Sequence, residues 1–167
     1  MIYVKFVNLI SILMICSYIG YIKAKIFEKR VIELNQFQNA LVMFKSKIEF
    51  TYEPINSIFA DISKVIYLNE ENIFYKTINF KEEIYSSWIK AIDETRNNLN
   101  KEDKDVIKMF GKMLGKTDIS GQVNEICLTQ SLVEKQIQKA EEEKNKNMKL
   151  YKTMGVVCGM GICIILI

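Results

Sequence analysis

The stretch that decides the fold is Phe6–Ile22, FVNLISILMICSYIGYI, a run of 17 residues without a charged side chain. A helix rises ~1.5 Å per residue, so a run of this length can just cross the ~30 Å hydrocarbon core of a bilayer. No small-x-small cleavage site ahead of a mature start is present, and the segment runs into Lys23 without a break. A cleaved signal peptide needs such a site. We therefore predict an uncleaved N-terminal transmembrane anchor over residues 1–23.

A second apolar run lies at the other end of the chain. Met154–Ile167, MGVVCGMGICIILI, has 14 uncharged residues. Tyr151 and Lys152 lengthen it, because tyrosine prefers the membrane interface and a lysine can snorkel towards water. We predict a C-terminal transmembrane segment over residues 151–167.

Two glycines in this second segment are spaced four residues apart. Gly155 and Gly159 form a GxxxG pattern, which lets helix backbones approach closely in lipid. We predict membrane packing at these glycines, with the N-terminal segment as the hypothetical partner. A plain membrane tail that contains glycines is the alternative.

The charges are distributed unevenly along the chain. Outside residues 24–150 the only charged residues are Lys5, Lys23 and Lys152, and all 20 acidic residues lie inside that range. Twenty basic residues accompany them, so the middle of the chain is formally neutral. A neutral domain gives no electrostatic reason to expect nucleic acid as a partner.

Basic residues also predict the topology. They gather after the first apolar segment and before the second, whereas Lys5 alone lies on the other side. By the positive-inside rule, residues 24–150 are cytoplasmic.

The middle of the chain shows helical periodicity. Apolar residues recur at spacings of three and four on a helix over residues 24–52, which Glu53 and Pro54 end because the residue before proline avoids helical geometry. The residues of this stripe are Val31, Leu34, Phe37, Leu41, Phe44 and Ile48. A second helix starts at Pro54 and has one apolar face, made of Ile55, Ile58, Phe59, Ile62 and Ile66.

Further helices are expected over residues 81–99 and 101–114, after a short helix with loops over 69–79. The last helix is capped by Asp118 or Ser120 and carries a heptad seam with one polar member, Gln130. Its seam residues are Ile119, Val123, Ile126, Gln130, Val133, Ile137 and Ala140. The expected fold is all-α, an antiparallel helical bundle over 24–150 flanked by N- and C-terminal transmembrane helices.

No residue pattern typical of catalysis is present. The chain has no histidine, its four cysteines share no metal-ligand spacing, and no phosphate-binding GxxxxGK[ST] loop occurs. Carboxylate pairs such as Asp103 and Asp105 fit solvated helix faces. We therefore expect no catalytic, cofactor-binding or metal-binding residues and no enzymatic activity.

Two segments resemble a known family. The run 110–118, FGKMLGKTD, comes before a long helix rich in Gln, Glu and Lys and a glycine-bearing apolar tail. The upstream run 48–55, IEFTYEPI, looks like a helix-break segment of the same family. In this order the segments are similar to the stage III sporulation protein AB family, and the resemblance covers essentially the whole chain.

That resemblance implies a place in the channel complex that links mother cell and forespore in endospore-forming bacteria. It implies a domain like the cytoplasmic domains of type II secretion platform proteins, in the mother-cell membrane around the forespore. The implied partners are the companion ATPase, stage III sporulation protein AA, and other channel subunits.

The resemblance and the capping rules together select the candidate structural or interaction residues. Phe110 and Leu114 would pack a turn, Gly111 and Gly115 would permit it, and Asp118 would cap the next helix. Glu49 and Pro54 would define a second helical corner. The alternative is a membrane-anchored scaffold, a homo-oligomer joined through the seam that contains Gln130.

Overall fold

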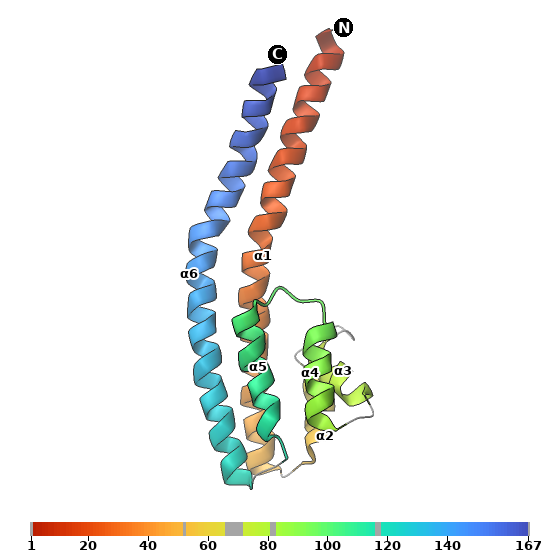
Figure 1. Cartoon of the computed structure of the whole chain (residues 1–167), viewed down its shortest axis with the longest axis vertical. Coiled ribbons are helices and arrows are strands. Elements are labelled where there is room, and N and C mark those ends of the chain that lie inside the picture. The colour runs from red at the N-terminus through yellow and green to blue at the C-terminus, as the bar shows by residue number, and fades with distance from the viewer. Residues whose placement is uncertain (1, 52, 66–71, 81–82, 116–117, 167) are drawn as a thin grey trace. The chain divides into compact units, whose positions relative to one another are not determined.

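The protein is described here by a computed structural model that covers residues 2–51, 53–65, 72–80, 83–115 and 118–166. These residues form six helices and no strand (Figure 1). The helices are α1 (Ile2–Phe50), α2 (Ile55–Val65), α3 (Ile73–Asn79), α4 (Ile84–Glu94), α5 (Lys101–Met113) and α6 (Ile119–Leu166). The predicted all-α fold, with long apolar helices at both ends, is confirmed.

The two terminal helices are far longer than the four between them. α1 has 49 residues and α6 has 48, and each contains a stretch apolar enough to cross a membrane. The chain divides into two compact units, unit 1 with Met1–Val31 and Lys139–Ile167, and unit 2 with Ile32–Gln138. The outer parts of both long helices therefore form unit 1, and their inner parts belong to unit 2 with α2 to α5.

The core of unit 2 is built around aromatic rings. The predicted stripe on α1 is buried throughout, and all of it except Val31 belongs to unit 2, for example Phe44 at 0% exposure. Six aromatic side chains, each at most 1% exposed, pack on one another, with centroids such as those of Phe44 and Phe110 only 5.3 Å apart. They are Phe37, Phe44, Phe59, Phe74, Trp88 and Phe110. Such contacts add to the area that the rings bury, so this cluster holds α1, α2, α3, α4 and α5 together.

The helix boundaries inside unit 2 differ from the predicted ones in places. α4 ends at Glu94 rather than at residue 99, because the chain after Thr95 is held by loop hydrogen bonds. Asn98 donates from its backbone and its side chain to the Glu33 carboxylate, at 2.8 and 2.6 Å. The predicted start of that helix, residue 81, and the predicted core residue Ile66 lie outside the described residues.

The solvated position predicted for Asp103 is wrong. Asp103 is 0% exposed and forms a reciprocal capping box with Asn100 at the start of α5. The Asn100 side chain accepts from the Asp103 backbone N–H at 2.8 Å, and the Asp103 carboxylate accepts from the Asn100 N–H at 2.9 Å. The box satisfies two backbone donors that a helix start leaves open, which makes burial of this carboxylate tolerable.

The buried stripe of α6 is not identical with the predicted seam. Ile126, Val133 and Ala140 are buried as the seam requires, but Ile119 is 42% exposed. Gln130 is half-buried. Buried polar residues complete the stripe instead, at Thr129 and Gln136.

Candidate functional site

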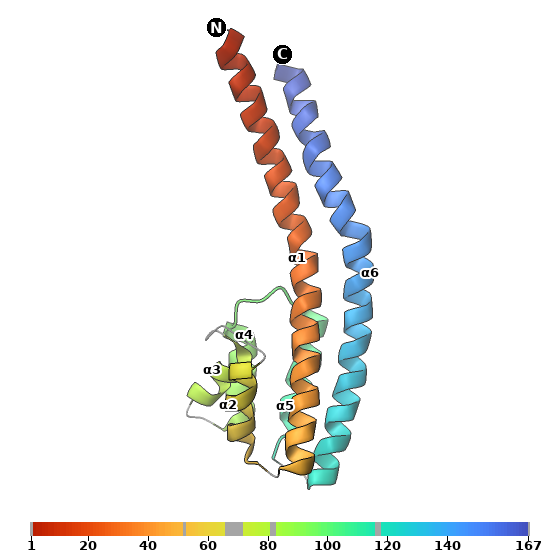
Figure 2. The same cartoon turned by 180° about the vertical axis from the view of Figure 1, so that it is seen from behind.

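The segments that carry the family resemblance meet at one end of unit 2. We call this the turn end and define it by residues 49–51, 53–55, 114–115 and 118–119. Here α1 and α5 end, and α2 and α6 begin (Figures 1 and 2). An ideal Cβ on Gly115 would lie 3.2 Å from Ile55 Cδ1, so the two segments touch.

Gly111 provides space for the chain's single tryptophan. A Cβ placed on Gly111 would lie 2.2 Å from Trp88 Cδ1, well inside contact distance. The indole Nε1 donates a buried hydrogen bond to the Ile107 carbonyl at 2.9 Å. Phe110 is 1% exposed and Leu114 7%. The structure therefore places these residues in the core, where they support the turn end from inside.

Gly115 and Asp118 shape the connection between α5 and α6. Gly115 has φ +71°, a left-handed conformation that suits glycine. The Asp118 carboxylate accepts from the Gly121 N–H at 3.0 Å, and its carbonyl accepts from the Gln122 N–H at 3.0 Å. Asp118 is thus the N-cap of α6.

An ion cluster ties α1 to α2 beside the turn. Lys47 Nζ lies 2.8 Å from a Glu53 oxygen and 2.6 Å from an Asp61 oxygen. Its hydrogen bonds with Asp61 and then Glu53 raise the pKa of Lys47. The Lys47 hydrogen bond, followed by its positive charge, lowers the pKa of Asp61. Pro54 follows Glu53, and its carbonyl accepts from the N–H groups of Ser57 and Ile58 in the first turn of α2.

The surface of the turn end combines apolar and acidic side chains. Phe50 is 74% exposed and Ile119 is 42% exposed. Glu49, Pro54 and Asp118 are also exposed. Exposed aromatic and aliphatic side chains with polar neighbours are the usual parts of a protein interface.

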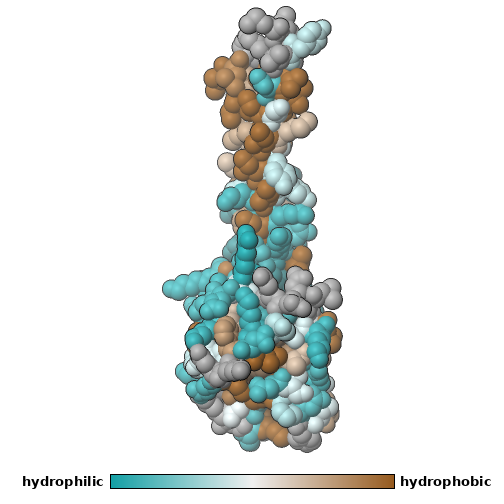
Figure 3. Space-filling model, turned by 90° about the vertical axis from the view of Figure 1, so that its right-hand side faces the viewer, coloured by the Kyte–Doolittle hydropathy of each residue, from teal (hydrophilic) through white to brown (hydrophobic). Residues whose placement is uncertain are grey.

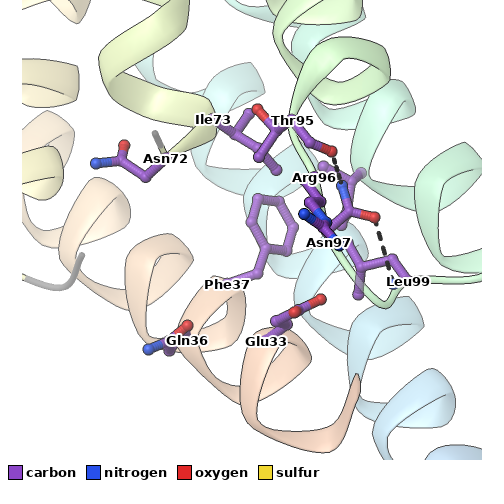
Figure 4. A pocket seen from close by; sticks show the side chains of 10 residues that line it. Glu33, Gln36, Phe37, Asn72, Ile73, Thr95, Arg96, Asn97 and Leu99 are labelled. Carbon is purple, nitrogen blue, oxygen red and sulfur yellow. Dashed lines mark hydrogen bonds between the residues drawn. The ribbon is translucent and has the colours of Figure 1, made fainter. Parts of the chain in front are cut away.

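A pocket of about 200 Å³ opens in the same unit (Figure 4). The Phe37 ring forms part of its wall, and Glu33, Arg96 and Asn97 supply polar groups. The Asn97 side chain donates a hydrogen bond to the Thr95 carbonyl and accepts one from the Leu99 N–H. These two bonds hold the loop that forms one side of the pocket. Ligand pockets usually enclose ~300–1,000 Å³. This pocket is smaller than that range.

The predicted packing glycines lie at the contact between the two helices of unit 1. A Cβ on Gly155 would lie 2.8 Å from the Cys16 carbonyl oxygen and 3.1 Å from the Gly20 Cα. A Cβ on Gly159 would lie 3.2 Å from the Cys16 Cβ and 3.3 Å from the Leu13 Cα. At Gly155 the backbones approach so closely that a side chain would collide with the Cys16 carbonyl, and at Gly159 a side chain would be tightly packed.

Sequence reasoning missed two contributors to unit 1. Gly20 is the glycine on α1 that faces Gly155, and its spacing of four from Cys16 was the available signal. Arg30, one of the basic residues that follow the first apolar segment, is 5% exposed and pairs with Glu143 at 2.6 Å. No local sequence pattern predicts this ion pair, because Arg30 and Glu143 are 113 residues apart.

Comparisons with known proteins agree on one family. The profile of the family described as stage III sporulation protein AB matches residues 5–167. Stage III sporulation protein AB of Bacillus subtilis is 23% identical over 168 residues, which cover 97% of this chain and 98% of that protein. A solved structure of stage III sporulation protein AB superposes with a TM-score of 0.64 at 20% identity, covering 71% of this chain and 98% of that one, so the fold is shared. These relatives are named for sporulation and not for an enzymatic activity. The chain belongs to the stage III sporulation protein AB family.

Proposed function

We propose that this chain is a non-enzymatic platform subunit of the sporulation channel between mother cell and forespore, and that its turn end docks the companion ATPase, stage III sporulation protein AA. The two apolar helices anchor it in the mother-cell membrane around the forespore, with residues 24–150 in the cytoplasm. Family membership supports the sporulation role. The exposed Phe50 and Ile119 at the turn end carry the docking proposal.

Several properties favour the turn end over other faces of unit 2. The turn end is a corner where four helices meet, and the ring of Phe50 is freely accessible there. The residues beneath the turn end are tightly packed. Lys47 pairs with Glu53 just before α2 and with Asp61 within α2, and Trp88 packs directly against Gly111. A rigid apolar anchor loses little conformational entropy when a partner covers it.

The acidic side chains around the turn end indicate which charge a partner surface should carry. Glu49 and Asp118 are exposed, whereas the nearby Glu53 is paired with Lys47. A partner surface with an apolar recess and basic residues around it complements this arrangement.

The alternative function, self-association through the α6 seam, has less support. Ile126 and Val133 belong to the hydrophobic core of their own chain. A seam that is buried within one chain is not free to pair with a second copy.

The experiment compares ATPase binding by full-length variants in detergent or nanodiscs. Phe50→Glu and Ile119→Glu each place a charge at the centre of the proposed interface. Hot-spot changes cost about 2 kcal/mol or more, and ~1.4 kcal/mol corresponds to a factor of ten. We therefore expect the Kd for the ATPase to rise at least about tenfold in each variant.

Val65→Glu is the matched control. Val65 is 66% exposed and lies at the other end of α2, so the same change there should leave Kd unaltered. Wild-type affinity in both turn-end variants would place the ATPase elsewhere and remove the docking proposal.

A further inference from the structure

Unit 1 carries a concentrated positive charge. It contains ten basic and four acidic residues, whereas unit 2 contains thirteen basic and sixteen acidic residues. Seven of the basic residues lie next to the apolar ends of α1 and α6, where Figure 3 shows brown apolar surface giving way to teal. They are Lys23, Lys25, Lys29, Lys144, Lys146, Lys149 and Lys152.

Contacts between the helices place these lysines in one layer. Gly20 lies against Gly155, and the Phe27 ring stacks on Tyr151 with centroids 5.7 Å apart. Arg30 pairs with Glu143 further along. Residues 23–29 of α1 therefore run beside residues 144–152 of α6. At ~1.5 Å per residue the layer is about 12 Å thick.

One face of this layer is hollowed. Lys144, Lys149 and Lys152 surround a shallow cavity of about 290 Å³ together with Asn145 and Met148. Met148 offers apolar surface, and Asn145 offers an amide donor. The hollow is several times the ~30 Å³ that one water molecule takes in the liquid, so a hydrated phosphate group fits.

The charges of the hollow lysines are not neutralised by carboxylates in the described part of the chain. In unit 2, Lys47 and Lys108 have acidic partners within 2.8 Å, but none of the three hollow lysines has an ion pair among the described residues. Lys152 instead lies with its Nζ 5.8 Å from the Tyr21 ring centroid. Lys25 lies 5.2 Å from the same ring, and its hydrogen bond with Tyr21 raises its pKa. The Lys25 ammonium group therefore stays charged beside the membrane interface.

We propose that the hollow formed by Lys144, Asn145, Met148, Lys149 and Lys152 binds the phosphate headgroup of an anionic phospholipid. The proposal rests on the two apolar segments crossing a bilayer and not on ATPase docking. Lysines just outside a membrane-spanning helix attract anionic lipids, and each contributes about fivefold in binding. A lipid also fits the position, because its acyl chains can lie along the apolar outer surfaces of α1 and α6.

The test uses the full-length chain in liposomes that contain phosphatidylcholine with spin-labelled phosphatidylglycerol or spin-labelled phosphatidylcholine. The fraction of immobilised label gives the relative association of each lipid. We expect several-fold preference for phosphatidylglycerol in the wild type. The variant Lys144→Gln/Lys149→Gln/Lys152→Gln should lose that preference.

A matched variant removes the same charge elsewhere. Lys101→Gln/Lys112→Gln/Lys135→Gln changes three exposed lysines of unit 2 and should keep the preference. Equal association of both lipids with the wild type would overturn the proposal, as would an unchanged preference in the hollow variant. Displacement of the lipid by inorganic phosphate alone at millimolar concentration would make the hollow a site for free phosphate and would also overturn it.

Discussion

The contact between Gly111 and Trp88 decides how tightly α4 and α5 can pack. A single methyl group on Gly111 would enter the indole ring, and the ring is held by its hydrogen bond to Ile107. Overpacking of a core costs about 1–3 kcal/mol. We predict that Gly111→Ala lowers the free energy of unfolding by that amount, measured by urea denaturation of the full chain and followed by the fluorescence of its single tryptophan.

The control for this change is another glycine without neighbours. A Cβ on Gly161 meets nothing within 4 Å, so Gly161→Ala should leave the urea midpoint unaltered. Equal midpoints for wild type and Gly111→Ala would show that the indole moves aside at little cost.

The Lys47 cluster predicts a pH dependence. The pKa of Asp61 is lowered in the folded state by Lys47. Its stabilising contribution is therefore complete above its unfolded value of about 3.9 and is lost as the pH falls through the folded value. The pKa of Lys47 is raised, so its contribution is complete below its unfolded value of about 10.4 and is lost as the pH rises through the folded value.

We predict that Asp61→Asn lowers the urea midpoint at pH 6 and that this difference shrinks as the pH falls to about 2.5. The measurement compares the two midpoints across that range. In a Lys47→Met background the pH-dependent difference should be much smaller, because Lys47 is the largest cause of the lowered pKa of Asp61. A constant difference at all pH values in the wild-type background would contradict the assignment.

At the scale of helices, the pairing of α1 and α6 in unit 1 depends on glycine. The Cys163 thiol donates to the Leu9 carbonyl at 3.4 Å, so a cysteine at position 9 should crosslink to Cys163. We predict that Leu9→Cys, with the other three cysteines changed to alanine, forms this disulfide readily in membranes under mild oxidation. Adding Gly155→Leu should abolish most of it, because the side chain would occupy the space of the Cys16 carbonyl.

Gly161→Leu serves as the comparison, since position 161 faces open space. Crosslinking should persist in that variant. Equal crosslinking with leucine at either position would mean that the two helices do not need close backbone approach.

Sequence periodicity correctly predicted the helices whose apolar residues all lie on one face. The α1 stripe from Val31 to Ile48 is buried because three- and four-residue spacing places its members on one helix face. The turn-end residues Gly115 and Asp118 followed from local capping rules. Both signals are contained in a few consecutive residues.

Features that depend on distant partners were not predictable in this way. Arg30 is buried because Glu143 meets it across the helix pair, and a single-sequence pattern does not show such a contact. Thr129 and Gln136 occupy the buried stripe of α6 although their side chains are polar. Their burial follows from the facing side chains and not from their own hydropathy. Asp103 was predictable in principle, since Asn100 three residues earlier completes a capping box.

At the scale of the whole molecule, the charge distribution predicts which side of the membrane each part occupies. Unit 1 has a net charge of +6 and unit 2 a net charge of −3, from the residues that each contains. The lysines of unit 1 lie on the inner side of both apolar segments, and Lys5 alone lies beyond the first one. The positive-inside rule therefore predicts that Cys127, exposed in unit 2, faces the cytoplasm.

This topology can be measured with a thiol reagent that does not cross membranes. In bacterial cells that express a variant with Cys127 as its single cysteine, labelling should require permeabilisation. A second variant that lacks all four native cysteines and carries Tyr3→Cys should be labelled in intact cells, since Tyr3 is 86% exposed and lies before the first apolar segment. Labelling of Cys127 in intact cells would reverse the orientation. The lysine layer would then lie on the outer face, where neither a cytoplasmic ATPase nor the inner-leaflet lipids could reach their proposed sites.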